Sequence, residues 1–435
     1  SAFLSAGQRC TNARRLILKD GDDRLVEAVL ALADRLIVGS PFDEPQPFMG
    51  PVISNAAADG LERGWAGLVA VGGRVLRPLV RARADRPGQA WSVRVPDGPL
   101  VFTGAVTGPA AADAATEAAG ALAELDRVVR AAGGDPAGIV RLNALVASDA
   151  DVAGVEAAVA HRFAGAPVAY TLVRTPLVTT GRRVAFEAVA TAASDSASVA
   201  FRGGAAVLPA GGKVFVSGQA EKGADVAEAV RATMAGLHRT LAHLGLRKAD
   251  VVQIKAFITP FADHAAAVRE VAASFDGGPV PPLVLIEWVS TLPAEIELIA
   301  SARALPAPAG DRVAWLPLPW LTVSPRYCRV SHVGGGVPLI FLGGIDGDGG
   351  GDARGQMKLI FERIGSALYE AGSSYRNLVK ATYYLSGAKA RTELGDIRGV
   401  YYDPARAPAA SALESLSLGS PGRTALIDLI ACPVK

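Results

Sequence analysis

The feature that most constrains this fold is a pattern that occurs three times in the same order. A β-like run ends in glycine, a helical stretch follows and closes at a second glycine, and two more strands complete the pattern. The period is about 110–130 residues, which is too long for a solenoid repeat, so each copy should be a domain with its own core. The repeated landmarks are the run-ending Gly104, Gly218 and Gly344, the helix-closing Gly133, Gly245 and Gly372, and the strands around Val140, Val252 and Val379.

Each repeat predicts an α+β unit in which helices cover one face of a sheet. The other face of each sheet needs a partner, and three such units on one chain can cover each other as a closed pseudo-threefold ring. The sequence divides into three repeats at 89–195, 196–306 and 307–435, preceded by an unrelated stretch at 1–88. We therefore expect the repeats to pack on one another within one chain.

Composition narrows the partners that a chain of this kind would have. Half of the 435 residues are hydrophobic and the net charge is +2, without the basic surface that nucleic-acid binding requires. No run of 18 apolar residues occurs, so no membrane partner is expected. The three cysteines, Cys10, Cys328 and Cys432, are odd in number and far apart, which indicates neither a disulfide framework nor a metal site. A reducing, cytoplasmic location follows from that cysteine usage.

The repeats also carry motifs of a known family. The segments Val216–Gln219, Leu244–Leu246, Val251–Lys255 and Leu292–Ala300 of the second repeat resemble the Rid (YjgF, reactive intermediate deaminase) family. The third repeat is similar at Glu370–Ser374 and Asn377–Thr382, and the first keeps the same order. This resemblance implies a chorismate-mutase-like fold, a trimeric arrangement, and sites between units that hydrolyse enamines and imines.

The resemblance also implies which residues serve the site. Each last strand carries one acid at Glu187, Glu297 or Asp428, and the family uses such an acid to position water. A family arginine binds the substrate carboxylate, but by spacing its positions are the apolar Val168, Leu283 and Ala410. Arg182 and Arg423 are possible substitutes. We expect small metabolites in interdomain clefts, with at most weak deaminase activity; alternatively, the acids are interface carboxylates held by backbone N–H groups, within a non-catalytic scaffold.

The N-terminal stretch resembles a different family. Gly7-Gln8-Arg9-Cys10-Thr11 is similar to the nucleophile segment of aldehyde dehydrogenases, and Pro45–Ser54 extends the likeness to the succinylglutamate-semialdehyde type of arginine catabolism. This implies an α/β fragment in which Cys10 would attack an aldehyde as a thiolate, with hydride passing to NAD. The family's cofactor domain and general base lie upstream of this cysteine. No cofactor is therefore expected for this chain, unless it is part of a longer NAD-dependent dehydrogenase–Rid fusion, as the start at Ser1 within a helical pattern suggests.

Overall fold

The computed structural model describes residues 86–347 and 349–434. Of the first 85 residues it describes only 23–33 and the single positions 18, 36, 48, 60, 61, 64, 65, 67, 68 and 71. Cys10 and all of the Pro45–Ser54 segment except Phe48 lie outside the described residues. Within the described part, none of the helices has both the length and the apolar character needed to cross a bilayer.

The three predicted long helices are present and are built alike. They are α3 (Ala114–Ala131), α5 (Val226–His243) and α7 (Ala353–Glu370), each 18 residues long. Each begins at an aspartate whose carboxylate accepts a hydrogen bond from a backbone N–H of the first turn, which satisfies a donor that the helix leaves open. Each is followed by the predicted glycine, with φ of +87°, +76° and +74° at Gly133, Gly245 and Gly372. Such backbone favours glycine because it lacks a Cβ.

Each repeat also has a second helix that the sequence pattern did not reveal. These helices are α4 (Val152–Arg162), α6 (His264–Ala273) and α8 (Ala388–Tyr401). They are rich in alanine or in polar residues, so their apolar periodicity is weak. Four short 3-10 turns complete the helical content of residues 86–434: η2 (Asp149–Asp151), η3 (Lys248–Asp250), η4 (Phe261–Asp263) and η5 (Tyr375–Asn377).

The strands form three mixed sheets, so the predicted α+β class is confirmed. The first sheet has the order β1 (Gln89–Ala90), β5 (Val168–Arg174), β4 (Gly134–Val146), β6 (Val184–Ala192), β3 (Leu100–Thr103), β8 (Ala205–Leu208), β7 (Ala200–Arg202). The second has the order β11 (Leu283–Glu287), β10 (Val251–Ile258), β12 (Ala294–Ser301), β9 (Lys213–Gln219), β14 (Val330–Val333), β13 (Val313–Leu316). The third has the order β17 (Ala409–Glu414), β16 (Leu378–Leu385), β18 (Ala425–Ala431), β15 (Leu339–Asp346), β2 (Ser92–Val95).

The leading strands of each repeat join the sheet of another repeat. Strands β7 and β8 of the second repeat extend the first sheet, and β13 and β14 of the third repeat extend the second. Strand β2, from the start of the first repeat, pairs antiparallel with β15 of the third. The exchange therefore runs in a closed cycle, although the sheets cut across the predicted boundaries, which themselves stay a prediction.

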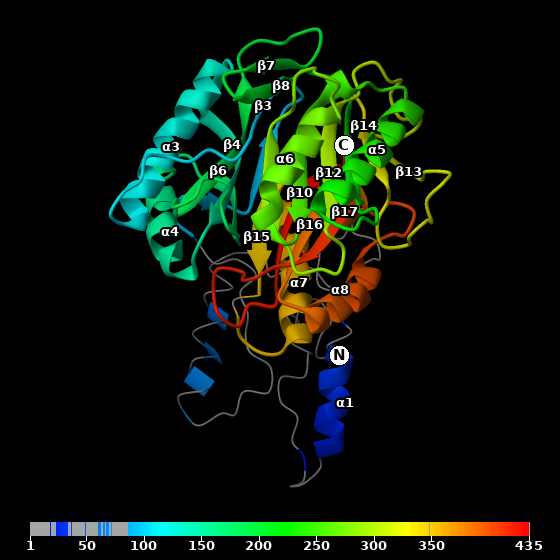
Figure 1. The fold of residues 1–435 in the computed structure, drawn as a ribbon. Coiled ribbons are helices and arrows are strands. Elements are labelled where there is room, and N and C mark those ends of the chain that lie inside the picture. The colour runs from blue at the N-terminus through cyan, green and yellow to red at the C-terminus, as the bar shows by residue number, and fades with distance from the viewer. Residues whose placement is uncertain are drawn as a thin grey trace.

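The two faces of the sheets have different partners. The helix pairs α3–α4, α5–α6 and α7–α8 lie on the outside of the molecule, one pair beside each sheet (Figure 1). Each sheet forms its own apolar core with its helices. The opposite faces meet in two further clusters that draw residues from all three repeats. The predicted partner of each bare sheet face is therefore the other two sheets.

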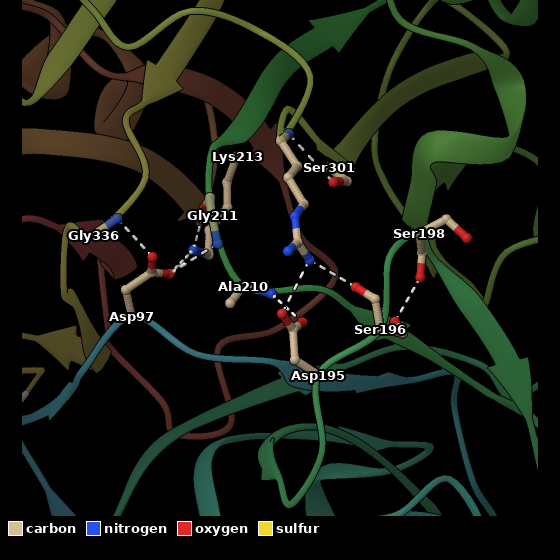
Figure 2. A network of polar contacts seen from close by, with 10 residues as sticks. Asp97, Asp195, Ser196, Ser198, Ala210, Gly211, Lys213, Ser301 and Gly336 are labelled. Atoms are coloured by element: carbon tan, nitrogen blue, oxygen red, sulfur yellow. Dashed lines mark hydrogen bonds and ion pairs between the residues drawn. The ribbon is translucent and has the colours of Figure 1, made fainter.

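A polar contact fastens the three repeats together at one end of the sheets. Lys213 at the start of β9 is 1% exposed and bonds the Asp97 carboxylate through its Nζ at 2.6 Å. Asp97 also accepts from the backbone N–H groups of Gly211 and Gly336, so one side chain of the first repeat holds turns of the second and third (Figure 2). A lysine buried to this degree is stable only because it is paired and hydrogen-bonded.

Candidate functional site

The three acids predicted from the sequence lie together on the inner faces of the sheets. Glu187 lies on β6, Glu297 on β12 and Asp428 on β18, and their exposures are 1%, 7% and 2%. Each carboxylate binds a cation from the next repeat rather than from its own. The pairs are Lys255 Nζ with Glu187 at 3.1 Å, Lys380 Nζ with Glu297 at 2.6 Å, and Arg141 Nη2 with Asp428 at 3.0 Å.

These contacts repeat one geometric rule around the molecule. Within its own sheet, each acid is opposite Asn143, Lys255 or Thr382 on the neighbouring strand. The residue two positions before each of these is Arg141, Gln253 or Lys380, and it reaches the acid of the preceding repeat in all three cases. We call the acids and these partners the central polar ring; its members are Arg141, Glu187, Gln253, Lys255, Glu297, Lys380 and Asp428.

The ring keeps the carboxyl group of Glu187 charged. Burial would raise the pKa of Glu187, but Lys255 and Arg141, with hydrogen bonds from Lys255 and Asn143, outweigh it, so its pKa lies below the ordinary value. The same balance holds for Arg141. Burial would lower the pKa of its guanidinium group, but the charges of Asp428 and Glu187 outweigh burial and raise that pKa. A carboxylate held ionised between fixed cations is a poor proton donor, because catalytic acid–base groups need a pKa near the working pH.

The sheet register corrects one of the three positions predicted for the family arginine. Leu283 is opposite Ile254 and Ala410 is opposite Ala381, as the spacing predicts. In the first repeat the residue opposite the equivalent Leu142 is Tyr170. Val168, two residues earlier, was predicted because spacing was counted back from the acid across a β5–β6 loop whose length differs between repeats. None of the three positions holds a cation.

The best-formed reactive group lies between the second and third repeats. Glu295 on β12 extends across Gly218, where a Cβ would lie 2.0 Å from Glu295 Oε1 and 2.7 Å from the Ser411 hydroxyl oxygen. Ser217, beside Gly218, accepts a hydrogen bond from the Ala410 N–H at 2.7 Å and donates to the Cys328 carbonyl at 2.6 Å. We call this arrangement of Ser217, Gly218, Glu295 and Ser411 the 2–3 cleft.

Glu295 is a candidate site residue that the sequence reasoning missed. Burial, followed by repulsion from Glu297, raises its pKa to about 7, although a hydrogen bond with Ser411 and the charge of Lys380 act in the opposite direction. The Ser411 hydroxyl also donates to Glu297, so one serine bridges the two carboxyl groups. Because residues two apart on a strand share a face, alternation could not separate Glu295 from Glu297.

The corresponding cleft between the third and first repeats has a different lining. Gly343 lies against β5 so closely that a Cβ would be 2.7 Å from both the backbone N and O of Tyr170. Arg86 binds the fully buried Asp346 with both oxygens in reach, at 2.9 and 2.8 Å. Arg423, which the sequence suggested as a substitute clamp, binds the same carboxylate at 3.1 Å. We call this the 3–1 cleft; its cavity of about 20 Å³ has room for about one water molecule.

The remaining residues considered from the sequence are not placed in either cleft. Arg182 lies in the loop before β6, and the structure gives its side chain no hydrogen bond or ion pair with the residues of 86–434. Cys328 and Cys432 are free thiols whose pKa burial raises to about 12, so neither is an activated nucleophile. Among the described residues, no group of three His, Cys, Asp or Glu side chains is placed to hold a metal ion.

Comparison with known proteins divides the chain into two kinds of sequence. Residues 1–89 match the aldehyde dehydrogenase family, and residues 332–432 match the family described as Endoribonuclease L-PSP. The two matches lie at opposite ends of the chain and do not overlap. The family match marks only the third repeat, while the three sheets are consistent with tandem units.

Curated relatives of the first segment are succinylglutamate-semialdehyde dehydrogenases. The N-succinylglutamate 5-semialdehyde dehydrogenase of Novosphingobium aromaticivorans is 57% identical over 88 residues, which is 20% of this chain and 19% of that protein. A Caulobacter vibrioides enzyme of the same name is 53% identical over 79 residues, which is 18% of this chain and 17% of that protein. The chain therefore spans about a fifth of the length of the curated relatives that it matches.

Solved structures similar to this chain include a member of the YjgF protein family. NMB1025 of Neisseria meningitidis, a member of the YjgF protein family, is 22% identical and covers 28% of this chain and 96% of its own, with a TM-score of 0.22. TdcF of E. coli, solved with bound serine, is 25% identical and covers 21% of this chain and 86% of its own, with a TM-score of 0.20.

Proposed function

We propose that this chain is a Rid-like protein that binds a small metabolite in the 2–3 cleft and retains weak enamine or imine hydrolysis there. The observation that carries the proposal is the raised pKa of Glu295, about 7, in a cleft formed by two repeats. A carboxyl group perturbed by burial and by a specific neighbour, at an interface that exposes bare glycine backbone, has the properties of a functional site.

Hydrolysis of an imine needs a group that can both give and take a proton. In the proposed reaction the protonated Glu295 donates to the imine nitrogen, and a water oxygen bonds to the imine carbon. The Glu295 carboxylate then removes a proton from the added water and returns it to the amine nitrogen. As the carbon–nitrogen bond breaks, the carboxylate takes the remaining hydroxyl proton, so that ammonia and a carbonyl product form and Glu295 is protonated again. A pKa near 7 leaves both protonation states populated at neutral pH, as general acid–base catalysis requires.

The same geometry explains why the activity should be weak. The positions of the family arginine hold Tyr170, Leu283 and Ala410, so no guanidinium is placed there to bind a substrate carboxylate. Charge-assisted hydrogen bonds to such a group contribute about 1.5–3 kcal/mol each. Affinity for carboxylate-bearing imines should therefore be low, and the reaction slow at ordinary substrate concentration.

We further propose that the three repeats form an intramolecular pseudo-trimer and that Glu187, Glu297 and Asp428 serve that assembly rather than catalysis. The cyclic exchange of strands and the cyclic order of the ion pairs support this proposal. Burying three acids is tolerable only when each is paired, and here each partner comes from another repeat.

The test is release of ammonia from freshly generated 2-aminoacrylate. The wild-type chain should release ammonia slowly but above the uncatalysed rate, and Glu295→Gln should remove that excess. Glu270→Gln, which changes an acid on α6 paired with Arg231, is the matched control and should leave the rate unchanged. Equal rates for wild type and Glu295→Gln would reject the catalytic role of Glu295. Activity equal to that of an arginine-bearing Rid protein would instead reject the weakened site.

A second candidate function is a non-catalytic scaffold attached to a dehydrogenase. It is favoured by the small volumes of the 3–1 cleft and of the central cavity, about 20 and 10 Å³, and by the match of residues 1–89 to aldehyde dehydrogenases. In that case Cys10 and NAD would act only in a longer protein that supplies the cofactor domain. Thermal-shift titration with small carboxylates separates the candidates, because a pure scaffold should show no saturable shift.

A further inference from the structure

The three repeats enclose a small cavity where their inner faces meet. Its volume is about 10 Å³, which is room for about one water-sized particle. The lining comes from all three repeats and consists of Arg141, Gln253, Lys255, Glu297, Leu298, Ile299, Lys380, Thr382 and Ile430.

The charges facing this cavity do not balance, although the central polar ring as a whole does. The ring has three cations and three acids. All three cations, Arg141, Lys255 and Lys380, line the cavity, but Glu297 is the only ring acid that does. Glu187 and Asp428 bind their cations from outside the lining. The wall of the cavity therefore presents more cationic than anionic side chains.

Several of these cations have donors that the protein does not use. Arg141 is 6% exposed, and its Nε–H has no acceptor in the part of the chain that the structure describes. Lys255 is 3% exposed, and within the described residues its Nζ forms one ion pair, with Glu187, although an ammonium group carries three N–H donors. A buried donor without an acceptor costs about 1–3 kcal/mol, so these two residues favour an acceptor in the cavity.

We propose that the central cavity binds one small inorganic anion of the chloride class. A single small ion fits the volume of the cavity. A monovalent anion would pair with the cationic side chains of the lining and would accept hydrogen bonds from their unused N–H donors. The apolar Leu298, Ile299 and Ile430 disfavour larger polyatomic anions, whose oxygens would need hydrogen-bond donors on every side. The site is separate from the 2–3 cleft and does not depend on the function proposed for it.

The first experiment locates the anion directly. Crystals of the full chain soaked in bromide should show an anomalous peak within hydrogen-bond distance of Arg141 and Lys255. An electron-density peak of a water, without anomalous signal at high bromide concentration, would overturn the proposal.

The second experiment measures the anion's effect on stability in solution. At constant ionic strength, replacing gluconate by chloride should raise the melting temperature in a saturable way, by roughly 1.5–2 °C at ten times the Kd. Lys255→Met should remove that response, whereas Lys248→Met, at an exposed lysine–carboxylate pair, should keep it. If Lys255→Met does not fold, the bromide result on the unchanged protein decides the question. Identical melting curves in chloride and gluconate would refute the site.

Discussion

Breaking the central polar ring at one partner should destabilise the protein strongly. Lys380→Met removes the cation that lies 2.6 Å from Glu297, in a pair whose side chains are only 5% and 9% exposed. At that distance the attraction is about 6 kcal/mol for an effective dielectric constant of about 20. Removing the cation leaves Glu297 with the Ser411 hydroxyl and without a compensating charge. The net loss should be about 3–5 kcal/mol, since the desolvation of lysine is recovered.

The assay is urea unfolding of wild type and variants at pH 7, followed by circular dichroism. Lys248→Met is the control, because Lys248 lies 2.7 Å from Asp276 in a pair that is 37% and 77% exposed. A surface pair of this kind contributes about 0–1 kcal/mol. The double variant Lys380→Met/Glu297→Leu should recover most of the loss, because no buried charge remains unpaired. A cost for Lys380→Met no greater than that for Lys248→Met would refute the reasoning.

Three further predictions test other parts of the structure. Because the pKa of Glu295 is raised to about 7, the folded state holds its proton more tightly than the unfolded state between about pH 4.5 and 7, so this residue lowers stability as pH rises through that window. Thermal melts should show Glu295→Gln gaining roughly 1–3 kcal/mol over wild type from pH 4.5 to pH 7, and a gap independent of pH would contradict the assigned shift. Gly343→Ala should lower the free energy of unfolding in urea by about 1–3 kcal/mol, because the added Cβ would lie 2.7 Å from the backbone of Tyr170. Gly104→Ala should cost less, because the nearest atom to its Cβ would be 3.5 Å away. The reverse order would argue against the close approach of Gly343 to Tyr170. In limited proteolysis followed by mass spectrometry, residues 1–88 should be cleaved before residues 89–435. Leu, Trp and Val side chains in the described part of residues 1–88 are exposed by 37–82%. Equal resistance of the two parts to the protease would contradict this prediction.

Local structure was predictable because its causes are local. The glycine after each long helix and the apolar strands on either side are determined by neighbouring residues, and each was found where expected. The acids Glu187, Glu297 and Asp428 were placed on the correct strands for the same reason. The second helix of each repeat was missed because its apolar pattern is weak and it depends on packing against the first helix.

The candidate site was only partly predictable, because its geometry depends on contacts between repeats. Glu295 and Glu297 lie on one strand and one face, yet Lys380 pairs with one and burial raises the pKa of the other. The position of Tyr170 followed from strand register and not from counting residues along a loop of variable length. Missing Glu295 and choosing Val168 in place of Tyr170 have the same origin, because sequence position alone does not say which residues of another strand or repeat lie nearby.

The sequence by itself determined three α+β units, their helix ends, the acids on their last strands and the absence of the family arginine. Hydrogen bonds and side-chain periodicity within a few residues are sufficient to specify these features. Only the tertiary structure decided that strands are exchanged in a closed cycle, that each acid is neutralised by another repeat, and that Glu295 has a pKa near neutrality. These outcomes depend on which faces meet, because the charges across an interface come from residues far away in sequence, as in the Lys380–Glu297 pair, whose members are 83 positions apart.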